Sequence, residues 1–97
     1  MLIFTTLREL TDYLAVQNDF DLGFVPTMGA LHEGHGSLIR QSVAAHKATL
    51  CSIYVNPAQF NDIKDFTAYP KTPEQDLAFL KACGCTMVFI PQSPLDL

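Results

Sequence analysis

Basic residues are scarce in this sequence, and this scarcity limits the partners that the chain can bind. Six lysines and arginines stand against ten aspartates and glutamates, which gives a formal net charge of -4 at pH 7. The basic residues are also scattered, whereas proteins that bind the phosphate backbone of nucleic acids carry a basic patch. We therefore expect no nucleic-acid partner.

Long apolar runs and paired cysteines are lacking as well. No apolar run is long enough to span a bilayer, and the N-terminus has no basic leader of the kind found in signal peptides. The three cysteines, Cys51, Cys83 and Cys85, are an odd number, whereas a secreted disulfide framework favours an even one. We expect reduced, partly buried thiols in a cytoplasmic protein that has no membrane partner.

Helical and strand patterns alternate along the 97 residues, of which 48% are hydrophobic. This composition is typical of one small globular domain. The patterns predict an edge strand at Leu2–Phe4, helices over Leu7–Val16, Gly34–His46 and from Thr72 to a stop at Gly84, and buried strands over Leu22–Val25, Leu50–Val55 and Met87–Ile90. Such alternation predicts an α/β fold, in which helices cover a parallel sheet. We expect Ala58–Lys71 to form a long functional connection and Gln92–Leu97 to form no element.

Local signals set the expected ends and faces of these elements. Thr6 with Glu9, and Thr72 with Gln75, have the spacing of capping boxes. Pro26 should end its strand, because proline does not extend a central strand. The residues expected to face the core from the last two helices are Leu38, Ile39, Val43, Leu77, Phe79 and Leu80.

The stretch 26–36 carries the densest chemistry. It reads Pro-Thr-Met-Gly-Ala-Leu-His-Glu-Gly-His-Gly and joins an expected strand to an expected helix, where α/β proteins bind phosphate. His32 and His35 are three apart, so their rings share one side of a first helical turn. Backbone N–H groups and imidazoles here predict an anion site. Neither a Walker-type loop nor GxGxxG is present, so the predicted anion site differs from both of these phosphate-binding motifs.

Purely structural roles remain open for these residues. His32 and His35 also suit a helix cap, or a zinc site with a cysteine, although no cysteine stands near them at ligand spacing. Met28 suits core packing, and Gln59 by itself is an ordinary loop residue. We expect solvated side chains rather than metal ligands at Asp62, Asp65 and Asp76. For Asp76, a helix cap is the other alternative to metal ligation.

Three blocks in order carry a family resemblance. They are the 26–35 turn, then Ser-Ile-Tyr-Val-Asn-Pro-Ala-Gln-Phe over 52–60, then Tyr-Pro-Lys-Thr over 69–72 with Asp76 and Leu77. Together they resemble the pantoate–β-alanine ligases, or pantothenate synthetases, over essentially the whole chain. His-x-Gly-His alone is shared with other HIGH-type nucleotidyltransferases, and Asn-Pro-x-Gln-Phe makes the resemblance specific.

The resemblance implies both a fold and a reaction. Residues 1–97 would be the N-terminal part of a three-layer, Rossmann-like nucleotide- and pantoate-binding domain of the HIGH type, without its C-terminal half or the lid domain. ATP and pantoate would give pantoyl adenylate and pyrophosphate, and β-alanine would then displace AMP to give pantothenate, on the route to coenzyme A. The family also implies Mg²⁺ with the nucleotide and a homodimer at full length. We expect the isolated chain to be inactive or nearly so.

The family's functional residues carry over to matching positions. The catalytic pair would be His35, assigned in the family as proton donor, and His32, its partner on the phosphates. Charge stabilisation suits both, because attack of a carboxylate on phosphorus needs no proton transfer. The implied ATP-binding set is Met28, Gly29, Ala30, Leu31, His32, Glu33, Gly34 and His35. The implied substrate-binding set is Gln59, for pantoate and β-alanine, with Pro26, Thr27, Met28 and Asn56, and no protein metal ligand is implied.

Three positions depart from the family's common residues: Gly36, Tyr54 and Lys71. Gly36 should weaken the helix start by about 1 kcal/mol. Two other functions stay open. The chain suits another HIGH-type nucleotidyltransferase acting on a phosphorylated acceptor, or a non-catalytic half-domain that binds nucleotide or self-associates through an open sheet edge.

Overall fold

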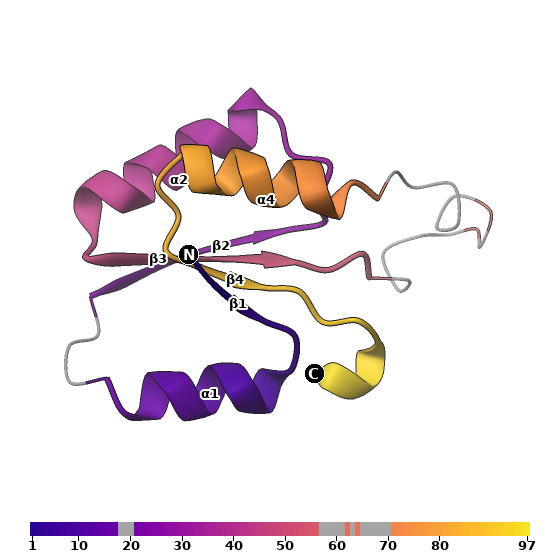
Figure 1. Cartoon of the computed structure of the whole chain (residues 1–97). Helices are drawn as coiled ribbons and strands as arrows, with labels where there is room; N and C mark the ends of the chain where they lie inside the picture. Colours follow the sequence, from indigo (N-terminus) through magenta and orange to yellow (C-terminus); the bar gives the residue numbers. More distant parts are fainter. Residues whose placement is uncertain (18–20, 57–61, 63, 65–70) are drawn as a thin grey trace.

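A parallel sheet organises the chain (Figure 1). The computed structural model describes residues 1–17, 21–56, 62, 64 and 71–97. The strands are β1 (Leu2–Phe4), β2 (Leu22–Thr27), β3 (Ala48–Ile53) and β4 (Met87–Phe89), in the spatial order β1-β4-β3-β2. These strands pair in parallel, with Leu2 opposite Met87, Leu50 opposite Met87, and Leu22 opposite Ala48. The prediction of a parallel α/β sheet is confirmed.

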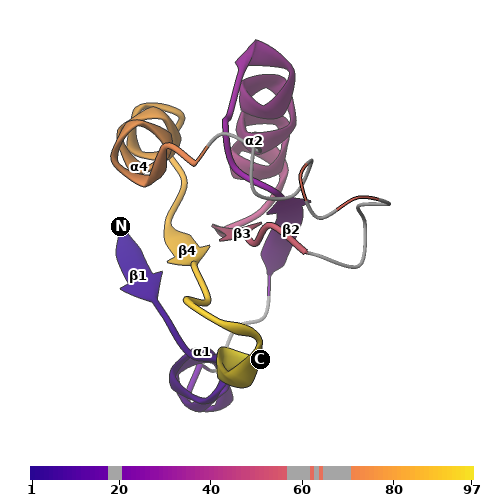
Figure 2. The ribbon, with the colours of Figure 1, turned by 90° about the vertical axis from the view of Figure 1, so that its right-hand side faces the viewer.

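Helices cover both faces of this sheet. Helix α1 (Leu7–Ala15) lies on one face, while α2 (Glu33–Ala45) and α4 (Pro73–Ala82) lie on the other (Figures 1 and 2). Strand side chains alternate between two core clusters. The cluster under α2 and α4 contains Ile39, Cys51, Ile53, Leu80, Cys85 and Val88, and the cluster under α1 contains Leu10, Leu50, Met87 and Phe89. Burial on both faces explains why β3 and β4 read as continuous apolar runs. The expectation of a buried strand at Leu22–Val25 is wrong in part, because β2 lies at an edge of the described sheet and Phe24 is 57% exposed.

Most of the predicted elements form within a few residues of their expected ends. Leu2–Phe4 is an edge strand, paired with β4. Thr6 caps α1, because its side chain accepts the Glu9 N–H at 3.2 Å. Gly84 follows α4 with φ of +89°, in the left-handed region that ends helices. Among the described residues, no helix has the length and apolarity needed to cross a membrane.

The prediction that Pro26 ends its strand is wrong. Strand β2 continues through Pro26 to Thr27, with Pro26 opposite Ser52. The Thr27 carbonyl accepts the Tyr54 N–H at 3.0 Å, so the backbone groups of the preceding residue point away from β3. Within the described sheet β2 pairs only with β3, and an edge position tolerates the missing proline N–H.

Three other expectations need correction. Thr72 makes no side-chain cap at the start of α4 and instead donates to Asp76 Oδ1 at 3.3 Å. Leu38 and Val43 are exposed, whereas Ile39 is fully buried. Helix α2 turns Gly36 toward α4, where an added Cβ would lie 2.8 Å from the Phe79 ring, so the buried stripe is rotated from the expected one. A 3₁₀ helix, η2 (Pro94–Asp96), forms in the segment expected to lack structure.

The connection Ala58–Lys71 lies mostly outside the described residues. The cysteine prediction is confirmed, since all three are free, Cys51 and Cys85 are buried and Cys83 is half-buried. Burial raises the pKa of the Cys51 thiol to about 12, and burial also raises that of Cys85. Both thiols are therefore neutral core groups at physiological pH.

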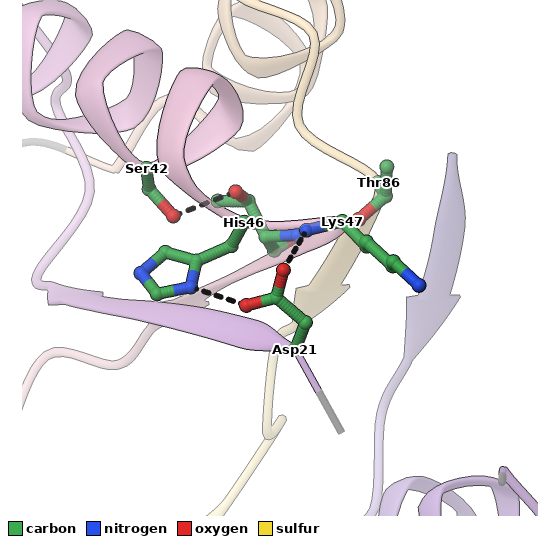
Figure 3. A network of polar contacts seen from close by, with 6 residues as sticks. Asp21, Ser42, His46, Lys47 and Thr86 are labelled. Atoms are coloured by element: carbon green, nitrogen blue, oxygen red, sulfur yellow. Dashed lines mark hydrogen bonds and ion pairs between the residues drawn. The ribbon is translucent and has the colours of Figure 1, made fainter. Parts of the chain in front are cut away.

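Polar contacts fasten the amino-terminal ends of three strands (Figure 3). Asp21, just before β2, bonds the His46 ring at 2.8 Å and accepts the Lys47 N–H at 3.1 Å. The bond from His46 is the main reason that the pKa of Asp21 lies below its usual value. The hydroxyls of Ser42 and Thr49 are 2.7 Å apart, and Thr86 accepts the Thr49 N–H at 2.8 Å. These bonds hold β2, α2, β3 and the start of β4 in register.

Neighbouring positions on α2 provide a matched test of this packing. Ile39→Ala should lower the free energy of unfolding by about 2–5 kcal/mol, because it leaves a cavity at a fully buried site. Leu38→Ala, at a side chain that is 52% exposed, should change it by about 0.5 kcal/mol or less. Urea unfolding followed by circular dichroism measures both variants, and equal losses would contradict the observed face of α2.

Candidate functional site

The turn between β2 and α2 lies at the carboxyl-terminal end of the sheet. Gly29 and Ala30 have φ of +82° and +50°, left-handed values that cost a non-glycine residue about 1–2 kcal/mol. Thr27 links this turn to the next strand, because its hydroxyl donates to the Ser52 carbonyl at 2.9 Å and accepts the Gly29 N–H at 3.2 Å. The backbone is therefore bent sharply just where β2 ends.

The Asp76 carboxylate holds the same turn from α4. It is 3% exposed, and its two oxygens accept the N–H groups of Ala30 at 3.0 Å and Leu31 at 2.9 Å. The expectation that Asp76 is solvated or caps its own helix is wrong. These two N–H groups lie far away in sequence and belong to the backbone, so residue patterns give no signal for the contact.

His32 and His35 cap α2 with their rings. His32 is the N-cap and its Nδ1 accepts the Gly34 N–H at 3.0 Å, while the Nδ1 of His35 accepts the His32 N–H at 3.1 Å. The ring centroids are 4.1 Å apart. The capping role considered from the sequence is confirmed. It also has a chemical consequence, because an Nδ1 that accepts a hydrogen bond places the proton of a neutral ring on Nε2.

Both imidazoles are therefore set up as Nε2–H donors. Burial is the main reason that the pKa of His35 is lowered, and the nearby His32 lowers it further, while Asp76 acts in the opposite direction. A neutral His35 keeps its Nδ1 bond and still offers one N–H group. This arrangement suits binding of an anion by hydrogen bonding rather than by transfer of a proton.

The turn's backbone is less available to an anion than the sequence suggested. The N–H groups of Gly29, Ala30, Leu31, His32 and Gly34 each donate to a side chain of the protein itself. Glu33 is exposed and pairs with Arg40 on the next turns of α2. The ring Nε2–H groups are donors at this turn that suit a bound anion.

Two adjoining hollows lie beside the turn. A pocket of about 270 Å³ is formed by the ends of β2, β3 and β4 and the start of α4, and it is lined by Met28, Gly29, Ile53, Tyr54, Val55, Lys71, Thr72, Pro73, Asp76, Ile90, Pro91 and Gln92. A more open groove of about 470 Å³ is lined by Pro26, Thr27, Met28, Ser52, Tyr54 and Asn56. Met28 and Tyr54 line both hollows.

The two hollows gather part of the set predicted from the sequence. Pro26, Thr27, Met28 and Asn56 line the groove, and Met28 and Gly29 line the pocket, whereas His32 and His35 line neither of the two. Gln59 lies outside the described residues. In the portion of the chain that is described, no three His, Cys, Asp or Glu side chains are placed to hold a metal ion.

Comparison with known proteins decides the family. The model of the family described as pantoate-beta-alanine ligase matches residues 2–94. The chain belongs to this family. Pantothenate synthetases from Campylobacter curvus and Porphyromonas gingivalis are 43% and 47% identical to it, each over 93 residues. These matches cover 96% and 94% of this chain but only 34% and 33% of those proteins, so the chain spans about a third of their length.

Solved structures agree with this assignment. Pantothenate synthetase from Thermus thermophilus superimposes with a TM-score of 0.84 at 36% identity, over 94% of this chain and 32% of that one. Pantoate-beta-alanine ligase from Francisella tularensis, complexed with beta-gamma ATP and beta-alanine, gives a TM-score of 0.89 at 36% identity, covering 94% and 35%. The chain therefore has the fold of the N-terminal part of these enzymes.

The state of His35 is open to direct measurement. Its imidazole should titrate below the usual value of about 6.5, because burial and His32 both oppose its charged form. A folded pKa below the unfolded one means that the contribution of His35 to stability is complete above about pH 6.5 and is lost as the pH falls through the folded pKa. Ring ¹H–¹⁵N spectra recorded against pH give this pKa and the tautomer.

His32→Asn supplies the companion variant. Asparagine keeps an acceptor for the helix cap but removes the second imidazole, so the pKa of His35 should move partway back toward its usual value of about 6.5. A His35 pKa at or above that usual value in the unsubstituted chain would contradict the expected effect of burial and His32. A neutral His35 ring protonated on Nδ1 would contradict the capping geometry.

Proposed function

We propose that this chain is the part of a pantoate–β-alanine ligase that holds ATP beside pantoate. The observation that carries the proposal is the His32–His35 pair at the carboxyl edge of the sheet, with each ring fixed by its Nδ1 acceptor bond. Family membership supplies the substrates. The pocket and groove on either side of Met28 supply adjoining spaces for a nucleotide and a small hydroxy acid.

In the proposed first step, a carboxylate oxygen of pantoate attacks the α-phosphorus of ATP. The bond from that phosphorus to the bridging oxygen breaks, pyrophosphate leaves, and pantoyl adenylate forms. Negative charge builds up on the phosphate oxygens, and preorganised donors aimed at such charge contribute about 3–4 kcal/mol each in comparable sites. The Nε2–H groups of His32 and His35 take this role without giving up a proton.

In the proposed second step, the amine of β-alanine attacks the acyl carbonyl of the adenylate. AMP leaves with the electrons of the cleaved acyl–oxygen bond, the amine loses a proton, and pantothenate forms. Gln59 is the residue proposed to hold pantoate near the entry of β-alanine, and the groove lined by Pro26, Thr27, Met28 and Asn56 is the space proposed for pantoate. Mg²⁺ would arrive with the nucleotide phosphates, which usually supply several of its ligands.

The wider setting belongs to the same proposal. We place the activity in the cytoplasm, on the route to coenzyme A, in a homodimer formed by the longer protein. The 97-residue chain spans about a third of its relatives, and we expect it to bind ATP with little or no turnover. Pantothenate formation at the full rate of the longer ligases would contradict the need for the remaining two thirds.

Substitutions of His35 and His46, at opposite ends of α2, test the proposed role of His35 in ATP binding. His35→Ala should weaken ATP binding by about 10- to 150-fold, because one hydrogen bond to a charged group contributes about 1.5–3 kcal/mol. His46→Ala is the control, since His46 contacts Asp21 at the opposite end of α2, and it should leave ATP affinity unchanged. Titration calorimetry with Mg·ATP measures both, and equal effects of the two substitutions would remove His35 from the site.

Two further outcomes would redirect the proposal. Pyrophosphate exchange by the longer protein that does not depend on pantoate would favour another HIGH-type nucleotidyltransferase. Self-association without ATP binding, detected by sedimentation, would favour the non-catalytic half-domain, for which β2 offers an edge that is unpaired within the described sheet.

A further inference from the structure

Asp76 occupies an unusual position for a charged side chain. It lies in the first turns of α4, is 3% exposed, and also lines the pocket beside Met28. Three neutral donors reach its carboxylate: the N–H groups of Ala30 and Leu31, and the Thr72 hydroxyl. Burying a carboxylate is costly unless its oxygens are bonded, so this placement indicates a specific requirement for the group.

The turn that Asp76 contacts is held in a conformation with little freedom. Gly29 lies so close to it that an added Cβ would be 3.0 Å from Asp76 Oδ2 and 3.1 Å from Ile53 Cγ2. Ala30 sits at φ of +50°, and such a residue persists only where its surroundings dictate its conformation. Asp76 supplies that constraint, because its two oxygens take two consecutive N–H groups.

We propose that Asp76 is a positioning residue, which acts through the backbone of residues 29–31 to aim Met28 and the histidine pair at the bound nucleotide. This inference rests on the proposed function for its ligand. The hydrogen bonds from Ala30 and Leu31 to Asp76 depend on the fold and not on the proposed function. A carboxylate is needed because both of its oxygens accept, whereas an asparagine would turn an NH₂ group toward one of the two N–H donors.

Electrostatics alone predicts the opposite effect on binding. A negative charge beside a triphosphate repels it, so neutralising Asp76 should strengthen ATP binding if charge were its main influence. Loss of positioning should weaken binding instead. The sign of the change therefore separates the two roles.

The first experiment uses the unsubstituted chain without ligand. NMR scalar couplings transmitted across hydrogen bonds should connect the ¹⁵N nuclei of Ala30 and Leu31 to the side-chain ¹³Cγ of Asp76. Coupling at both amides supports the two-oxygen contact, and its absence at either amide overturns it. This measurement does not depend on ATP binding or on a variant that folds.

The second experiment compares Asp76→Asn with Glu74→Gln, which removes the same charge from an exposed position in the same turn. In Asp76→Asn, amide hydrogen exchange should accelerate by about tenfold or more at whichever of Ala30 and Leu31 faces the NH₂ group, as expected for loss of one bond, while that of Val88 in the core stays unchanged. Glu74→Gln should alter neither. If the amides of Ala30 and Leu31 exchanged as slowly in Asp76→Asn as in Glu74→Gln, the positioning role would be overturned.

Mg·ATP titrations of the same proteins complete the test. Asp76→Asn should raise the dissociation constant by about tenfold, and Glu74→Gln should leave it unchanged or lower it slightly. Tighter binding by Asp76→Asn would overturn the proposal in favour of a charge effect. If the unsubstituted chain binds no ATP, the proposed function fails, and the couplings and exchange rates alone decide whether Asp76 fixes the turn.

Discussion

The contact between the Asp76 carboxylate and the backbone of the 29–31 turn connects the parts of the molecule that form the site. It joins α4 to the start of α2, and the Thr27–Ser52 bond joins the same turn to β3. The pocket exists because these elements meet at the carboxyl edge of the sheet. At the amino-terminal ends of the strands, the contacts of Asp21 and Thr86 fix the strand register. Polar bonds at both ends thus enclose an apolar middle.

Capping and chemistry share the same atoms in the histidine pair. The bonds that satisfy the first N–H groups of α2 also fix the tautomer of each ring, so local folding determines which nitrogen can donate to a ligand. The two interpretations weighed from the sequence, a helix cap and a phosphate site, are therefore compatible. A residue that caps a helix through Nδ1 remains free to work through Nε2.

The sequence predicted what depends on neighbouring residues. Alternating patterns located each of the described strands, Gly84 marked the end of α4, and the 26–36 stretch was correctly placed between a strand and a helix. The sequence did not predict the contacts that depend on residues far apart along the chain. The two N–H groups that Asp76 accepts lie 45 and 46 positions away, and the buried face of α2 is set by the approach of Phe79 to Gly36. Helical periodicity wrongly predicted that Leu38 and Val43 face the core, because periodicity contains no information about where another helix packs against α2.

The pairing of β1 with β4 has a consequence for the order in which the chain folds. Leu2 meets Met87, so β1, the first of these four strands in the sequence, completes its hydrogen bonds only after nearly all of these residues have been synthesised. At roughly 5–20 residues per second, β1 waits on the order of ten seconds for its partner. It has only three residues, and two of them remain exposed even after pairing. So short a strand is a weak template for aggregation while it waits.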